Sequence, residues 1–416
     1  MQLYNTLSRR LEPFAPAGPA MTMYVCGVTP YDTTHLGHAR CYVVYDLLQR
    51  YVRYRGHDVR YVQNVTDVDD DLLRKARELG KPYDVVAREN LEILRRDMEA
   101  LNVLPPAVWP RATQEVPTML EIAQTLVARG QAYAREGNVY FRAASASDFG
   151  TLSRRSPEQM IARLREERFD PDDPRKEDPL DILMWQAAAP GEPTWDSPWG
   201  PGRPGWHIEC TAMALRHLGT TIDVHGGGED LIFSHHESER VQAECYTGVQ
   251  PFVRFWMYAG TVYAGREKMS KSLRNLVLVR ELLPRYSGDA IRLYLAQEHY
   301  RAHLTFEEAR LAEAAALVER LRAVAALAAP GEGPTPLGAQ AAIVPASDDF
   351  RARFEAAMDA DLDTPGAVEV LRDLAAAVES DPIGPAALGR ASLLNELASV
   401  LGLRLAGQPG TVWPEY

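Results

Sequence analysis

Residues 21–65 restrict the possible folds of this 416-residue chain more than any other segment. An apolar run at residues 23–26 leads into a turn with Gly and Pro, then into apolar residues at helical spacing as far as Gly56, and then into a second apolar run. This order predicts a strand, a helix and a parallel strand. Parallel sheets bind ligands beyond the carboxyl ends of their strands. The turn after the first strand carries His35 and His38, so we expect both at that edge.

The pattern that follows predicts a large α/β domain with an insertion. Residues 69–130 have mainly helical periodicity, and residues 131–200 contain many prolines and charges, which indicates an irregular insertion. The predicted fold is a Rossmann-like, doubly wound parallel sheet over residues 1–300, with the insertion around residues 100–200.

Further strands and helices are expected in the second half of this domain. Apolar runs predict strands at residues 221–225, 252–258 and 277–279. Helical periodicity surrounds them at residues 207–218, 235–247 and 288–298. These elements would complete the doubly wound sheet.

The C-terminal part, residues 301–416, is predicted to be a small α-helical bundle. An Ala-rich helical pattern at 306–328 ends in a stretch rich in Pro and Gly, residues 329–336, which cannot continue a helix and predicts a linker or long loop. Further helical patterns lie at residues 350–358, 367–377 and 393–401.

Composition narrows the class of protein. Hydrophobic residues make up 46% and charged residues 25% of the chain, as in ordinary globular proteins, and no apolar run approaches the roughly 20 residues that span a bilayer. The first residues show no secretory signal, so we expect a cytoplasmic location and no membrane partner. A net charge of -12 argues against broad, sequence-independent nucleic-acid binding, although it leaves room for a local basic patch.

Two short motifs far apart in the chain predict a site that activates a substrate with ATP: HLGH at residues 35–38 and KMSKS at residues 268–272. Gly37 lets the backbone approach a planar ligand, while the two imidazoles and the start of the following helix can contact phosphate oxygens. Alone, the first motif is more typical of surface or capping histidines. Its combination with the second motif favours adenylation.

The two lysines of the second motif supply the complementary chemistry. On a loop of small residues, they can close over a triphosphate and neutralise the charge that develops on departing pyrophosphate. The alternative is a solvated basic loop. The predicted catalytic residues are therefore His35, His38, Lys268 and Lys271.

Four residues of types suited to zinc stand out in the sequence. Cys26 ends the first strand, Cys210 follows a Trp-His pair, and His235 and Glu239 are four positions apart, hence on one face of a helix. For each cysteine a buried core position is the alternative, and for the helical pair a surface salt bridge. Four cysteines in so long a chain do not form a disulfide framework. The cysteines expected in the core are Cys41 and Cys245.

The motifs taken together make the chain resemble the cysteinyl-tRNA synthetase family of class I. They are CGVTPYD at 26–32, HLGH, NVTD at 64–67, RPGWHIEC at 203–210, GGGED at 226–230, HHE at 235–237 and KMSKS. This family includes the mycothiol-pathway ligase, which joins cysteine to glucosaminyl-inositol. The resemblance extends from about Leu3 to Leu403.

The resemblance implies roles for particular residues. It implies one zinc ion per chain, held by Cys26, Cys210, His235 and Glu239. It places the bound cysteine beside Thr29, Thr66 and Trp206, and the adenylate near Gly227, Gly228 and Asp230. A soft metal would separate cysteine from the nearly isosteric serine, which a hydrophobic pocket does poorly. Trp206 could equally be a core residue.

ATP would bring Mg²⁺ with it. The resemblance also implies that Gly37 and Lys271 contact ATP. The acidic run at residues 67–71 could suggest a magnesium site. The start of a helix is the favoured interpretation of this run, because carboxylates are stabilised there.

The implied reaction activates L-cysteine to cysteinyl-adenylate and passes the cysteinyl group to an acceptor. Only about a dozen residues follow Leu403, whereas tRNA ligases of this family ordinarily continue into an anticodon-reading module, and residues 29–39 resemble the sugar ligases. Glu239 as a fourth ligand and the opening LYNTL at 3–7 are features of the tRNA enzymes. The balance favours the amine of glucosaminyl-inositol by a small margin, with tRNA-Cys as the alternative.

A hypothesis of another class is a noncatalytic relative that binds cysteine or zinc. The intact HLGH and KMSKS motifs argue against it, because a binding module has no leaving group to stabilise. No protein partner is inferred.

Overall fold

A parallel sheet forms the centre of the computed structural model, which describes residues 1–265, 267–269, 275–328, 348–406 and 409–415. Within these residues the sheet has the strand order β10-β9-β3-β4. Its strands are β3 (Ala20–Val28), β4 (Asp58–Val65), β9 (Ile222–Gly228) and β10 (Val253–Ala259). Helix α1 (Leu36–Tyr54) connects β3 to β4, so the predicted strand–helix–strand unit is confirmed.

Strands β3 and β4 approach each other closely at their carboxyl ends. Their register runs from Ala20 opposite Asp58 to Val28 opposite Val65, with an irregularity between Val25 and Val28. A Cβ atom on Gly27 would lie 1.6 Å from the carbonyl oxygen of Asn64. Only glycine therefore fits this position, and the close approach brings the loops that follow both strands together.

The order in which the chain adds strands to the sheet reverses between β3 and β9. The chain proceeds from β3 to β4 on one side, and β9 and β10 lie on the other side of β3. Loops that leave the neighbouring ends of β3 and β9 therefore diverge and open a crevice, which is where such sheets bind ligands. In the chain, β9 is preceded by α6 (Trp206–Leu218) and followed by η2 (Glu229–Leu231), η3 (Ile232–His236) and α7 (Glu237–Thr247).

The strand predicted at residues 277–279 is wrong. This segment has an irregular backbone that leads into α8 (Val279–Leu282). Leu278 forms a single antiparallel bridge with His35, so these apolar residues pair with the HLGH loop rather than with the sheet. A short apolar run does not reveal from sequence which backbone it will pair with.

The region between β4 and β9 is helical at first and then forms a second sheet. The predicted helices are α2 (Asp70–Leu79), α3 (Tyr83–Ala100) and α4 (Ala112–Ala128). The insertion is more regular than predicted, with an antiparallel sheet in the order β5-β6-β7-β8. Its elements are β5 (Ala132–Arg135), β6 (Asn138–Phe141), η1 (Ala143–Ser145), α5 (Pro157–Glu166), β7 (Ile182–Ala187) and β8 (Gly202–Pro204). These strands are short and separated by loops rich in Pro, which hides their alternation.

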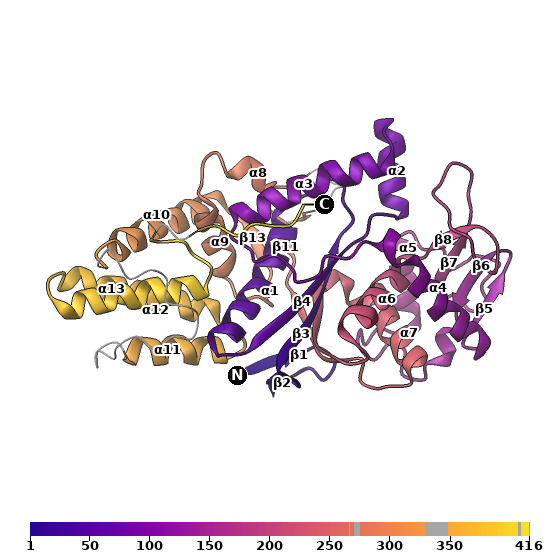
Figure 1. Ribbon diagram of the computed structural model, residues 1–416, viewed down its shortest axis with the longest axis horizontal. Helices are drawn as coiled ribbons and strands as arrows, with labels where there is room; N and C mark the ends of the chain where they lie inside the picture. Colours follow the sequence, from indigo (N-terminus) through magenta and orange to yellow (C-terminus); the bar gives the residue numbers. More distant parts are fainter. Residues whose placement is uncertain (266, 270–274, 329–347, 407–408, 416) are drawn as a thin grey trace.

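The C-terminal part contains the predicted helices, and the linker predicted at 329–336 lies outside the described residues. The helices are α10 (Glu308–Ala325), α11 (Asp348–Asp359), α12 (Thr364–Ser380) and α13 (Pro385–Val400). Helix α9 (Gly288–Ala296), predicted in the second half of the α/β domain, precedes them. The small strands are β1 (Gln2–Asn5), β2 (Arg10–Pro13), β11 (Val262–Ala264), β12 (Glu267–Lys268) and β13 (Leu304–Phe306). Figure 1 shows α10 to α13 at one end of the molecule and the insertion at the other.

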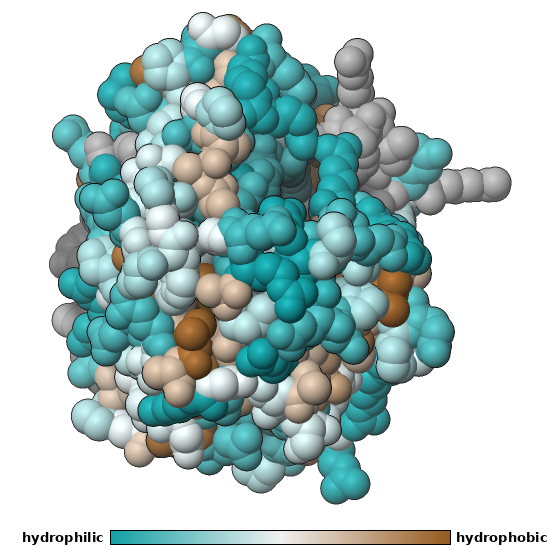
Figure 2. Space-filling model, turned by 90° about the vertical axis from the view of Figure 1, so that its right-hand side faces the viewer, coloured by the Kyte–Doolittle hydropathy of each residue, from teal (hydrophilic) through white to brown (hydrophobic). Residues whose placement is uncertain are grey.

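The surface on the insertion side is mostly hydrophilic, with hydrophobic residues in small, separate groups (Figure 2). The insertion buries its large side chains inward, among them Trp185 and Phe141. Across the described ranges, none of the helices has both the length and the apolar character that crossing a bilayer requires.

Candidate active site and metal centre

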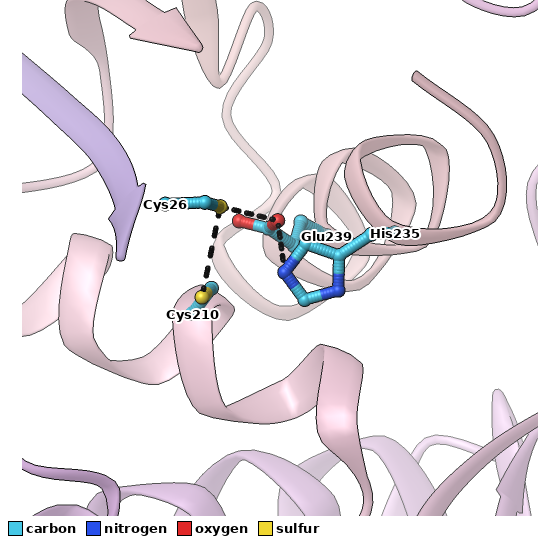
Figure 3. Close-up of side chains that lie close together, drawn as sticks. All are labelled: Cys26, Cys210, His235 and Glu239. Carbon is cyan, nitrogen blue, oxygen red and sulfur yellow. Dashed lines mark hydrogen bonds and ion pairs between the residues drawn. The ribbon is translucent and has the colours of Figure 1, made fainter. Parts of the chain in front are cut away.

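Two thiols, an imidazole and a carboxylate converge at the crevice beside β3 and β9 (Figure 3). Cys26 comes from β3, Cys210 from α6, His235 from η3 and Glu239 from the first turn of α7. All four side chains are buried, and their candidate ligand atoms lie within 4.8 Å of one another. The fold thus brings together all four of the ligands predicted from sequence.

The spacing of these atoms matches a tetrahedral zinc site. Typical zinc–sulfur and zinc–oxygen bonds place two thiolates about 3.8 Å apart, and a thiolate about 3.5 Å from an oxygen ligand. The Sγ atoms of Cys26 and Cys210 are 3.8 Å apart, and Cys26 Sγ is 3.7 Å from Glu239 Oε1. Glu239 Oε1 is 3.1 Å from His235 Nε2. The donor set and its dimensions therefore fit zinc.

A change of direction in the chain points His235 and His236 toward this cluster. Phe233 has extended backbone angles inside η3, and regular helix resumes only at Glu237. His235 and Glu239 still occupy one face, as their spacing of four predicts. His235 also has a partner behind it, because its Nδ1 lies 2.9 Å from Nδ1 of His207.

Sequence reasoning missed two histidines that lie in the same cluster. Together with Cys26 and Glu239, the side chains of His225 and His236 form a second group whose ligand atoms are within 4.8 Å of one another. His225 Nε2 lies 2.8 Å from Glu239 Oε2, and His236 Nε2 lies 3.1 Å from Cys26 Sγ. The doublet at 235–236 and the histidine before GGG were the available signals, but their orientation depends on the tertiary fold.

Burial controls the charge of this cluster. It raises the pKa of the Cys26 and Cys210 thiols, and it lowers the pKa of the His235 and His236 imidazoles. Burial also raises the pKa of Glu239, and the charge of His225 opposes that shift. The surroundings alone therefore favour neutral thiols. A bound divalent cation reverses this preference, because a coordinated thiol loses its proton.

The HLGH motif forms the start of α1. His35 is the N-cap residue, and its Nδ1 accepts a hydrogen bond of 3.3 Å from the backbone N–H of His38. The two imidazole rings stack with their centroids 3.6 Å apart. A Cβ atom on Gly37 would lie 2.9 Å from the His35 ring, so glycine preserves this arrangement. The motif thus presents two imidazoles at a helix N-terminus, where anions are stabilised.

The segment after KMSKS holds the HLGH loop in place. The Leu36 N–H donates to the carbonyl of Val277 at 2.9 Å, and the Val279 N–H donates to the carbonyl of Thr34 at 3.0 Å. The guanidinium of Arg280 donates to the carbonyl of Thr33.

The described part of KMSKS begins at a hairpin. The Lys268 backbone pairs with Tyr263 across β11 and β12, and Met269 is buried. The Lys268 side chain and all of Lys271 lie outside the described residues, so the roles of both lysines stay predictions.

The glycines predicted to lie near the adenylate adjoin the metal cluster. Gly227 and Gly228 end β9, and Asp230 follows in η2. A Cβ atom on Gly227 would lie 2.8 Å from a methyl carbon of Leu231 and 3.7 Å from Cβ of Cys26. The bare backbone of this strand end therefore lies beside the predicted metal ligands.

The three residues predicted to surround bound cysteine have different positions. Trp206 stacks on His235 with ring centroids 4.1 Å apart and lines a cavity of about 490 Å³, so its ring is not wholly in the core. Thr29 donates to Asp69 at 2.8 Å, and the buried Thr66 accepts from Asn64 at 3.1 Å. Both hydroxyls therefore have partners within the protein.

The acidic run lies at the start of α2, as predicted. Asp69 is the N-cap residue and accepts from the Leu72 N–H. Asp70 pairs with Arg203 of the insertion, and Asp71 accepts from a tyrosine hydroxyl. The carboxylates thus bind side chains around the crevice.

Comparisons with known proteins agree with this geometry. The family model described as tRNA synthetases class I (C) catalytic domain matches residues 14–316, and the DALR domain model matches residues 353–406. The cysteine–tRNA ligase of Dehalococcoides mccartyi is 45% identical over 409 residues, which cover 97% of this chain and 87% of that protein. The cysteine–tRNA ligase of Thioalkalivibrio sulfidiphilus is 45% identical over 419 residues, 98% of this chain and 86% of that protein.

A solved structure supports the fold. The Mycobacterium tuberculosis methionyl-tRNA synthetase, bound by methionyl-adenylate, superposes with a TM-score of 0.63 at 17% identity, over 95% of this chain and 99% of that chain.

The relatives do not support the preference for glucosaminyl-inositol, and they favour the alternative acceptor, tRNA-Cys. The motifs could not separate the two acceptors, because activation of cysteine requires the same residues in either case. The resemblance seen in the sequence is confirmed: the chain belongs to the class I aminoacyl-tRNA synthetases, as an enzyme of the cysteine–tRNA ligase family.

Proposed function

We propose that this protein activates L-cysteine with ATP and transfers the cysteinyl group to tRNA-Cys. The observation that carries the proposal is the convergence of Cys26, Cys210, His235 and Glu239 beside the glycine edge of β9. A donor set for a soft metal and a bare backbone suited to a nucleotide thus share one crevice.

The four side chains are proposed to hold one zinc ion. When bound, zinc supplies a soft Lewis acid that prefers the sulfur of cysteine to the hydroxyl of serine. Trp206 would then cover the amino acid from the cavity side, since it stacks on His235. Selection at the first binding step requires no second, corrective site.

The nucleotide is proposed to lie across the strand ends. The stacked imidazoles of His35 and His38 at the start of α1 would contact phosphate oxygens, with Mg²⁺ accompanying the ATP. The backbone of Gly227 and Gly228 and the carboxylate of Asp230 would contact the adenylate. Lys268 and Lys271 would neutralise charge on the departing pyrophosphate.

The proposed acceptor follows from the relatives. Both reported ligases have names that specify tRNA, and each is aligned over at least 86% of its length. The 3′-terminal ribose hydroxyl of the tRNA would attack the carbonyl carbon of the adenylate, and AMP would leave with its bonding electron pair.

Two assays test the proposal. Zinc-replete protein should exchange labelled pyrophosphate into ATP when cysteine is present, at least 100-fold faster than with serine. Purified tRNA-Cys and glucosaminyl-inositol should then be offered in parallel with labelled cysteine. Charging of tRNA supports the proposal. Labelling of the amino sugar alone would reject the proposed acceptor, and absence of exchange would reject cysteine activation.

A further inference from the structure

We propose that His236 is a hydrogen-bond donor to the Cys26 thiolate and not a metal ligand, and that Tyr258 holds it in this role. The inference rests on the proposed metal site. It assigns a positioning function to two residues that the ligand set leaves without one.

The three residues form a chain of contacts from separate elements. His236 in η3 places Nε2 at 3.1 Å from Cys26 Sγ in β3, and its Nδ1 lies 2.9 Å from the hydroxyl of Tyr258 in β10. His236 is 0% exposed, and the other two residues are each 5% exposed. Water therefore has little access to these contacts.

A metal-bound Cys26 determines the direction of both hydrogen bonds. A thiolate has no proton and can only accept, so the proton of a neutral His236 must be on Nε2. Nδ1 is then an acceptor, and the Tyr258 hydroxyl must donate to it. This arrangement requires one tautomer of His236, which Tyr258 stabilises.

Distances distinguish this role from that of a ligand. A sulfur and a nitrogen bound to one tetrahedral zinc lie about 3.5 Å apart. The separation of 3.1 Å between Cys26 Sγ and His236 Nε2 is shorter and suits a hydrogen bond. His236 Nε2 is also 3.8 Å from Glu239 Oε1, beyond the roughly 3.4 Å expected for a nitrogen and an oxygen on one zinc. Its Nδ1 lies 2.9 Å from the Tyr258 hydroxyl, so both ring nitrogens have partners within the protein.

The hydrogen bond to Cys26 changes the affinity of the metal for a further thiolate. A donor to a coordinated thiolate draws electron density from sulfur, so the thiolate gives less charge to the metal. A metal that already carries two protein thiolates then keeps more affinity for a further one. In this enzyme the further thiolate is the substrate, so His236 and Tyr258 would favour capture of cysteine.

Cobalt(II) in place of zinc provides a direct readout, because its sulfur-to-metal charge-transfer band reports electron density on the thiolates. The full-length protein and the variants Tyr258→Phe and His236→Leu, which has no donor, should be loaded with cobalt, and cobalt content measured with each spectrum. We expect the band to move to longer wavelength in both variants, and less in Tyr258→Phe, which keeps the imidazole.

Tyr45→Phe is the matched control. It removes a buried tyrosine hydroxyl that binds the carbonyls of Gly227 and Met257, at 3.1 and 2.6 Å, and does not contact Cys26 or His236. The sulfur-to-metal charge-transfer band of cobalt-loaded Tyr45→Phe should keep the wavelength of the unmodified protein.

Each other outcome overturns the inference. Unchanged bands in cobalt-loaded Tyr258→Phe and His236→Leu would exclude the proposed hydrogen bond. Loss of one nitrogen neighbour from the metal in His236→Leu, seen by X-ray absorption, would make His236 a ligand. If His236→Leu does not fold, Tyr258→Phe decides alone. Failure of the unmodified protein to bind cobalt would reject the metal site and this inference with it, whereas cysteine-dependent pyrophosphate exchange tests the proposed function separately.

Discussion

Cys210 and Cys245 have the same side chain and opposite surroundings. Cys210 is buried beside Cys26 and Glu239, whereas Cys245 is half-buried near the end of α7 and is not a member of the metal-ligand groups formed by the described residues. Reactivity toward a metal depends on neighbouring donors as much as on the thiol. The two residues therefore form a matched pair for testing the site.

Replacing Cys210 with Ser should lower metal content and cysteine activation together, because a hydroxyl is a poor ligand for a soft cation. We expect zinc affinity to fall by at least about 100-fold, the upper end for loss of a partner of a metal ligand. Metal analysis and cysteine-dependent pyrophosphate exchange check this. Cys245→Ser should retain full metal, and a Cys210→Ser protein with full metal would remove Cys210 from the ligand set.

The protonation state of Asp69 affects the stability of the fold around the crevice. Burial raises the pKa of its carboxyl to about 6, against the opposing hydrogen bonds from Leu72 and Thr29. Between about pH 4 and pH 6 the folded state therefore holds a proton that the unfolded state has lost. The contribution of Asp69 to stability falls as the pH rises through this window.

Asp69→Asn keeps a side chain that can cap α2 and removes this titration. We expect the melting temperature of the variant, relative to the unmodified protein, to rise from about pH 4 to about pH 6 and then to level off. Thermal unfolding followed by circular dichroism measures the difference. Asp84→Asn, on the exposed start of α3, serves as control and should show no such trend. A difference in melting temperature that does not vary with pH would contradict the raised pKa of Asp69.

Elements that sequence analysis treats separately meet at the HLGH loop. The segment that follows KMSKS hydrogen-bonds this loop at Thr34 and Leu36, and α8 adds the contact between Arg280 and Thr33. A displacement of the segment beyond KMSKS would therefore reach the start of α1, where both histidines lie. Small displacements at such sites reduce rates strongly.

Arg280→Gln should lower the maximal rate of pyrophosphate exchange by about 10-fold, within the range expected for misplaced catalytic groups. The Michaelis constant for cysteine should change little, because the metal cluster lies on other elements. Steady-state exchange kinetics separate the two effects. Arg285→Gln removes an exposed arginine that pairs with Glu308 and should leave both constants unchanged. Equal effects in the two variants would show that loss of a positive charge, and not loss of the contact between Arg280 and Thr33, lowers the rate.

At the scale of the whole molecule, buried polar contacts join α1, α9 and the C-terminal segment. Arg50 Nε lies 2.7 Å from Asp46 Oδ2, and Arg292 pairs with the same carboxylate. Burial raises the pKa of Asp46, but the two guanidinium groups outweigh it and hold the pKa below the usual value. Further along the chain, Trp413 packs against Trp109 and donates to the carbonyl of Val103 at 2.8 Å.

Trp413→Ala should destabilise this junction by about 3–5 kcal/mol, the usual cost of truncating a buried tryptophan. Urea unfolding followed by circular dichroism should show a lower midpoint than in the unmodified protein. The neighbouring Val412 is 78% exposed, so Val412→Ala provides the control. Equal midpoints for the two variants would mean that Trp413 does not stabilise the fold.

Local sequence was sufficient to predict the central strand–helix–strand unit, most helices outside the insertion and the four metal-ligand candidates. Periodicity reports which face of an element is apolar, and the spacing of His235 and Glu239 reports a shared helical face. The short strands of the insertion and the path of residues 277–279 could not be predicted in this way, because pairing partners are not encoded in a run of a few apolar residues.

Only the tertiary structure decided which donors meet. Cys26 and Cys210 are 184 positions apart, and their sulfur atoms approach to 3.8 Å because helix α6, which carries Cys210, packs against β3. The tertiary fold also brings His225 and His236 to Glu239 and Cys26, and Tyr258 to His236. Residue types can be read along a chain, whereas the direction of a buried hydrogen bond depends on every neighbour that the fold places around it.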